Sequence, residues 1–160
     1  MQWSKITDII LISSFTILAV FAILGLCQWI QRKSLKKVDK PLLAMLVPLA
    51  LMAATYIIFD KLLILNTRPN GSGEPSFPST HTMVVATIFF CVAIILPKYI
   101  KSKLARITLD FLMLALLILV CIGRVAANMH WISDVVGGLI FAAIFAVIYY
   151  LIIRRSKNHA

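Results

Sequence analysis

The sequence predicts an all-α membrane protein, a polytopic helical bundle of about five transmembrane helices, and two observations carry that prediction. The chain of 160 residues is 61% hydrophobic and only 14% charged, so a soluble domain of this length could not bury its apolar surface. Its apolar residues also form runs that approach or exceed the roughly 20 residues a helix needs to cross a bilayer. No repeat or low-complexity tract divides the chain, and we expect residues 1–160 to form one domain.

The first two predicted helices flank a basic loop. Ile9 to Ile30 is one apolar run, too long for a cleavable signal peptide, and its basic cluster follows the run instead of preceding it. Pro41 opens the second helix, because proline suits the first helical turn. We expect this helix to continue through Lys61 to about Leu65, with Pro48 as the position of a kink.

A loop separates these two helices from three more. Residues 66–78 include the segment 70–73, Asn-Gly-Ser-Gly, and three prolines, a composition typical of a loop. Ser79 or Thr80 can cap the helix that follows. The last three predicted helices cover roughly residues 80–96, 104–122 and 130–153.

The distribution of Lys and Arg predicts the orientation. Twelve of the 16 lie in the loop 31–40, the loop 97–106 and the C-terminal tail, which alternate helices place on one side of the membrane. The positive-inside rule makes that side cytoplasmic, so the net charge of +10 requires no nucleic-acid partner. The other four cations lie on the outer side and are Lys5, Lys61, Arg68 and Arg124.

Three short polar clusters interrupt the apolar sequence. They run from Lys61 to Pro69, from Phe77 to His81 and from Gly123 to Asp134. Together they supply cations, imidazoles, a hydroxyl and a carboxylate, which suits holding a phosphate, attacking its phosphorus and protonating the leaving oxygen. The charge distribution independently places all three clusters at the outer face.

Each cluster also has a plainer interpretation. Lys61 and Arg68 are two helical turns apart and could share one face if the helix persists, but they could equally be interfacial anchors. His81 lies at an expected helix N-terminus, which suits phosphate, or it is an ordinary first-turn residue. Asp134 lies four residues after His130, so its carboxylate could hold one ring nitrogen as N–H and leave the other as a nucleophile.

Taken together, the clusters resemble a known family. The order Lys-x6-Arg-Pro, Pro-Ser-x-His and Arg-x5-His-x3-Asp, over roughly residues 61–138, resembles the type 2 phosphatidic acid phosphatase (PAP2) superfamily. The resemblance implies a four-helix catalytic core, a phosphohistidine intermediate on His130 supported by Asp134, and protonation of the leaving group by His81. It implies no metal or other cofactor. The phosphate-binding residues it implies are Lys61, Arg68, Ser79, Arg124 and the backbone N–H of Thr80.

Three departures from the family pattern stand out. Thr80 replaces the usual Gly and narrows the phosphate cradle, and Gly123 replaces a usual Ser and removes a hydroxyl. Membrane members usually have three helices before the first motif, whereas this chain has room for two. Lipid, or a second copy of the chain in a homodimer, would then cover the exposed flank.

The expected function is an integral-membrane lipid phosphatase of the plasma membrane with its active site facing outside. It would remove the terminal phosphate of a lipid phosphate or diphosphate, with undecaprenyl diphosphate the leading substrate and phosphatidylglycerophosphate or phosphatidic acid the alternatives. A non-catalytic lipid-binding or transport protein is the alternative of another class, and the complete set of catalytic-type residues argues against it. The soluble vanadium haloperoxidases share the motifs, but five spans exclude them.

Overall fold

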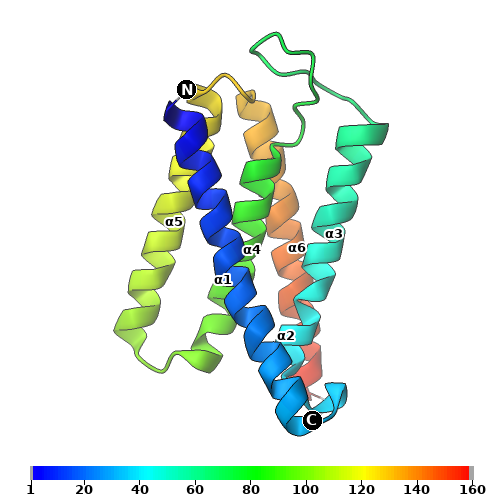
Figure 1. Ribbon diagram of the computed structural model, residues 1–160, viewed down its shortest axis with the longest axis vertical. Coiled ribbons are helices and arrows are strands. Elements are labelled where there is room, and N and C mark those ends of the chain that lie inside the picture. The colour runs from blue at the N-terminus through cyan, green and yellow to red at the C-terminus, as the bar shows by residue number, and fades with distance from the viewer. Residues whose placement is uncertain (1, 159–160) are drawn as a thin grey trace.

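The computed structural model describes residues 2–158, and the chain folds as a bundle of helices (Figure 1). The helices are α1 (Gln2–Arg32), α2 (Lys40–Ala44), α3 (Leu46–Ile57), α4 (Thr80–Tyr99), α5 (Lys103–Ala126) and α6 (Ile132–Asn158). A 3-10 turn, η1 (Leu35–Lys37), follows α1, and a π-helical turn, η2 (Ile58–Leu62), ends α3. Within the described residues, 5 helical segments are long and apolar enough to cross a membrane, which confirms the predicted number of spans.

The first span begins earlier than predicted. Helix α1 starts at Gln2 instead of near Ile9, because the polar residues of its first two turns include no helix breaker. Lys5 and Asp8 therefore belong to a helix and not to a preceding tail.

The second span is interrupted and ends early. The α-helix breaks at Met45, between α2 and α3. The break lies one turn before Pro48, which cannot donate to the carbonyl of Ala44 and whose ring crowds that carbonyl. The expectation that this helix reaches Leu65 is wrong, because η2 ends at Leu62 and Leu63 has φ −128° and ψ 82°.

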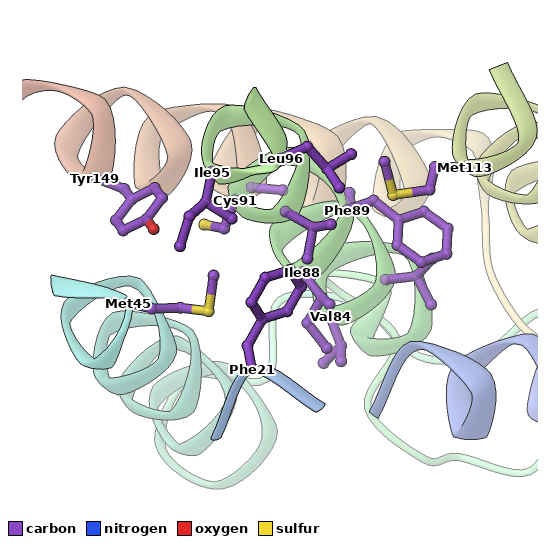
Figure 2. Close-up of a cluster of buried hydrophobic side chains, with 14 of the residues drawn as sticks. Phe21, Met45, Val84, Ile88, Phe89, Cys91, Ile95, Leu96, Met113 and Tyr149 are labelled. Atoms are coloured by element: carbon purple, nitrogen blue, oxygen red, sulfur yellow. The ribbon is translucent and has the colours of Figure 1, made fainter. Parts of the chain in front are cut away.

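Helix α4 forms the centre of the bundle. In α4, 67% of an apolar stretch of 18 residues is buried. The corresponding share is 17% in α1 and also 17% in α5. Figure 2 shows α4 side chains meeting residues of the surrounding helices in one hydrophobic core. The labelled members are Phe21, Met45, Val84, Ile88, Phe89, Cys91, Ile95, Leu96, Met113 and Tyr149. The outward faces of α1 and α5 keep exposed apolar side chains, as expected of helices that contact lipid.

The polar and basic segments lie at opposite ends of the bundle (Figure 1). The start of α1, the loop 63–79 and the α5–α6 connection 127–131 share one end, which we call the site end. The turn η1, the connection 100–102 and the C-terminal part of α6 share the other, which we call the basic end. The fold thus gathers the loop and helix starts that carry the three polar clusters.

Candidate active site

The loop 63–79 folds back on itself and lies over the start of α6. The Ser76 N–H donates to the carbonyl of Asn66 at 2.9 Å, and the Arg68 N–H donates to the carbonyl of Glu74 at 3.0 Å. Trp131 directly precedes α6, and its indole N–H donates to the carbonyl of Thr67 at 2.9 Å. These bonds hold Arg68 and Ser76 beside the α5–α6 connection.

Helices α4 and α6 approach each other closely where the site forms. A Cβ on Gly138 would lie 2.9 Å from the Ser79 carbonyl oxygen and 3.2 Å from the Met83 nitrogen. The Ser79 N–H donates to the carbonyl of Asp134 at 2.9 Å. The missing side chain at Gly138 therefore lets the first turns of the two helices pack together and brings the second and third clusters into contact.

His130 is buried, and its two ring nitrogens have different surroundings. Nδ1 lies 2.8 Å from the Ser76 carbonyl oxygen, an acceptor that fixes the proton on Nδ1. Nε2 faces the Arg124 guanidinium at 3.4 Å. Burial, and then the positive charge of Arg124, lower the pKa of His130 to about 4. The ring is therefore neutral at pH 7, with the Nε2 lone pair toward the cations.

Asp134 is fully buried but does not bond His130 directly. Its Oδ2 lies 3.9 Å from His130 Nδ1. The Ser76 hydroxyl lies between them, donating to Asp134 Oδ2 at 3.3 Å from Nδ1, and the Trp131 backbone N–H also donates to Oδ2 at 2.9 Å. We expected the Asp134 carboxylate to bond the imidazole of His130 directly. In the structure the Ser76 carbonyl accepts the hydrogen bond from Nδ1 of His130, and Asp134 contacts the Ser76 hydroxyl.

The two arginines keep unpartnered donors. The Arg124 side chain is 4% exposed and lies 3.8 Å from Asp8, and Arg68 pairs with Glu74 at 2.6 Å. Among the described residues, the buried side-chain nitrogen and oxygen atoms without a hydrogen-bond partner are Nε of Arg68 and Nε of Arg124. Buried polar groups are normally satisfied, so these two N–H groups are available to an anion.

The start of α4 supplies the second cluster. Ser79 is the N-cap residue, as predicted, but its hydroxyl accepts from the Thr82 hydroxyl at 3.1 Å and makes no side-chain cap bond. Thr80 lines a small cavity of about 20 Å³ together with Arg68, Ser76 and His130. His81 Nε2 lies 2.8 Å from Asp8 Oδ1. Through Asp8 and Arg124, His81 joins the network that contains His130.

Lys61 lies apart from this network. Its side chain is 67% exposed, and its ammonium pairs with Asp60 at 2.7 Å. Because η2 ends at Leu62, Lys61 and Arg68 do not share one helical face. A role for Lys61 in phosphate binding stays a prediction.

Two residues of the network were missed in the sequence. Ser76 acts through its backbone carbonyl and hydroxyl, and no residue pattern distinguishes it from other loop serines. Asp8 is the only acidic residue of α1. An ionisable residue in a membrane helix is a functional signal, but the predicted helix began one residue too late to include it.

Comparisons with known proteins agree with this fold. The family model of the PAP2 superfamily matches residues 9–158. The structure is similar to the crystal structure of a transmembrane PAP2-type phosphatidylglycerolphosphate phosphatase from Bacillus subtilis, with a TM-score of 0.69 and 21% sequence identity, over 98% of this chain and 75% of that chain. Comparison with curated proteins gave no match. Since the family match spans nearly the whole helical bundle, the chain belongs to the PAP2 superfamily and is a multi-pass membrane phosphatase.

Proposed function

We propose that the chain hydrolyses the terminal phosphate of a lipid phosphate or diphosphate through a phosphohistidine on His130. One observation supports this above the others. A buried, neutral imidazole presents Nε2 to Arg124 at 3.4 Å, while Nε of Arg124 and Nε of Arg68 have no partner. A nucleophile and unsatisfied cationic donors thus lie together, as attack on a bound phosphate requires.

The reaction has two steps. His130 Nε2 attacks phosphorus, the bond from phosphorus to the lipid oxygen breaks, and His81 gives its proton to that oxygen. Water then attacks phosphorus, the P–N bond breaks, and His81 takes a proton from the water, so inorganic phosphate leaves and both histidines are restored. During the first step the ring of His130 becomes positive, and the Ser76 carbonyl at Nδ1, with Asp134 behind it, stabilises that charge.

The charge of the phosphate is met by the loop and the helix starts. Arg68 and Arg124 can each present planar pairs of N–H groups to phosphate oxygens. The start of α4 offers the backbone N–H of Thr80 and the positive end of the helix dipole, while the Ser79 N–H already donates to the carbonyl of Asp134. Lys61 would have to leave Asp60 to join them.

The proposed substrate is undecaprenyl diphosphate, on the outer face of the plasma membrane. The site end of the bundle would lie at headgroup level, and the positive-inside rule directs the basic end to the cytoplasm. Phosphatidylglycerophosphate is the second candidate, supported by the name of the structurally similar Bacillus subtilis phosphatase. Phosphatidic acid shares the same headgroup chemistry.

Phosphate release by purified protein in detergent tests the proposal. The assay compares undecaprenyl diphosphate, phosphatidylglycerophosphate and phosphatidic acid, each beside His130→Ala. We expect the highest kcat/KM for undecaprenyl diphosphate. A preference for either glycerolipid would reject the proposed substrate, and equal release by His130→Ala would reject the mechanism.

Cysteine labelling tests the orientation. In a variant without the native cysteines, we expect a membrane-impermeant thiol reagent to label Ser72→Cys in intact cells and Ser102→Cys only after the cells are opened. The reverse pattern would place the site inside.

A further inference from the structure

Helix α1 brings one carboxylate to the catalytic network. Asp8 lies in the second turn of α1, and its side chain is 49% exposed. Its Oδ1 lies 2.8 Å from His81 Nε2 and 3.8 Å from Arg124 NH1, and its Oδ2 accepts from the Ser4 hydroxyl at 3.4 Å. Asp8 precedes the family match, which begins at residue 9.

The packing of α1 on α5 explains how Asp8 reaches this position. A Cβ on Gly123 would lie 2.6 Å from Thr7 Cγ2 and 3.4 Å from the Trp3 ring. Thr7 is fully buried, and its hydroxyl lies 3.5 Å from Arg124 NH1. The glycine that departs from the family pattern thus makes room for α1, and Thr7 takes the place of a side chain at 123 beside Arg124.

The electrostatic surroundings of His81 give Asp8 a specific task. The charged groups that face the His81 ring are Arg124 from α5, Arg68 from the loop 63–79 and Asp8 from α1. Burial and the two guanidiniums disfavour a positive ring, whereas the Asp8 carboxylate, 2.8 Å from Nε2, favours it. A proton donor in this place needs such a partner.

We propose that Asp8 is a positioning residue that orients His81 and stabilises its protonated form. This rests on the proposed role of His81 as the proton donor. The carboxylate holds Nε2–H of His81, so Nδ1 is the ring atom that gives its proton to the leaving oxygen and later takes one from water.

Leaving-group dependence separates this role from a structural one. An alkyl leaving oxygen needs a proton, whereas the oxygen of an aryl phosphate such as p-nitrophenyl phosphate hardly does. General acid catalysis contributes on the order of 100-fold or more. We therefore expect Asp8→Asn to lower kcat for a lipid phosphate by roughly tenfold or more, with a much smaller loss for p-nitrophenyl phosphate. Asp8→Glu should recover part of the rate.

Four further single variants and one double variant complete the experiment. His81→Ala should show the same leaving-group pattern, and adding Asp8→Asn to it should cause no further loss, because both act on one proton transfer. Lys5→Gln, one turn earlier on α1, is the matched control and should keep the wild-type rate. His130→Ala tests the proposed function separately and should be inactive on both substrates. The fourth variant, Gly123→Ser, should push α1 away and reproduce the Asp8→Asn pattern.

The outcomes distinguish the two proposals. If Asp8→Asn keeps the wild-type kcat for the lipid phosphate while His130→Ala is inactive, the role of Asp8 is rejected and the phosphatase mechanism stands. If Asp8→Asn instead lowers KM or raises kcat, the carboxylate competes with substrate phosphate, and the positioning role is likewise rejected. Full activity of His130→Ala would reject the proposed function itself.

Discussion

The two ends of the bundle contrast in how much space they enclose and in how their charges are satisfied. The basic end has a cavity of about 990 Å³ with largely apolar walls and Lys36, Lys40 and Lys98 among its lining residues, whereas the cavity beside His130 measures about 20 Å³. At the basic end, burial alone would raise the pKa of Asp39, but hydrogen bonds from Lys98, Gln28 and Tyr99 outweigh it and lower that pKa to about 2.

The contrast shows what marks a site in this fold. Asp39 is surrounded by donors and has an evident structural role in joining α1, α2 and α4. At the site end two buried guanidinium N–H groups lack any partner beside a neutral imidazole. Unsatisfied polar groups, and not the size of the cavity, are the reason for which we place the proposed chemistry at the site end.

Removing the central group of each end should give the largest difference. His130→Ala should abolish turnover, because no nucleophile remains, and acid quenching should trap acid-labile phosphate on the wild type only. Asp39→Asn should lower thermal stability and leave kcat near the wild-type value. Trapped phosphate that survives in His130→Ala but disappears in His81→Ala would reverse the roles of the two histidines.

Changing arginine to lysine should lower kcat/KM at the site end and leave it unchanged at the basic end. Arg68→Lys and Arg124→Lys keep the charge but lose the planar fork, and one such contact contributes about 1.5–3 kcal/mol, or roughly tenfold to a hundredfold in kcat/KM. Arg32→Lys at the basic end is the control and should behave as the wild type. Wild-type kcat/KM in both site variants would remove the arginines from the phosphate site.

Two serines of the loop 63–79, Ser76 and Ser72, test whether Asp134 acts through the Ser76 hydroxyl. Ser76→Ala keeps the backbone carbonyl that accepts from His130 and removes the hydroxyl that links it to Asp134. One lost hydrogen bond to a charged group is worth about 1.5–3 kcal/mol, and since the carbonyl remains we expect a loss in kcat near the lower limit, about tenfold. Ser72→Ala, in the exposed part of the same loop, should change nothing. An unchanged kcat in Ser76→Ala would show that Asp134 does not act through this hydroxyl.

The pH profile should show that His130 stays neutral in mild acid. With its pKa near 4, about 90% of the ring is neutral at pH 5, against about 3% for an ordinary histidine with a pKa of about 6.5. In the His81→Ala background with an aryl phosphate, the rate of phosphohistidine formation should therefore change less than about twofold between pH 7 and pH 5. A fall of tenfold or more would place the pKa near its ordinary value.

Chelation should have the smallest effect. The arginines and the start of α4 can neutralise a phosphate without an added ion, so saturating EDTA should leave turnover intact. Inhibition that magnesium then reverses would indicate a metal-dependent mechanism.

Hydropathy and charge predicted the fold more completely than the site. Five spans follow from apolar runs, because a bilayer demands length and composition that few soluble helices have. The segregation of Lys and Arg predicted that the clusters would share one end, as the structure shows (Figure 1). The sequence could not indicate Ser76, whose main contact is a backbone carbonyl, or Thr7, whose place depends on how closely α1 packs on Gly123. The end of the helix at Leu62, which prevents Lys61 and Arg68 from sharing one helical face, also has no simple sequence signal.

The central position of helix α4 limits which substitutions its sequence can accept during evolution. Its body is the centre of the core, and its first turn holds Ser79, Thr80 and His81. A substitution there that altered substrate choice would disturb packing at the same time, so selection would act on both properties together. Residues 70–74 of the loop 63–79 are exposed and free of that constraint, and we expect new lipid preferences to arise there while α4 keeps its sequence.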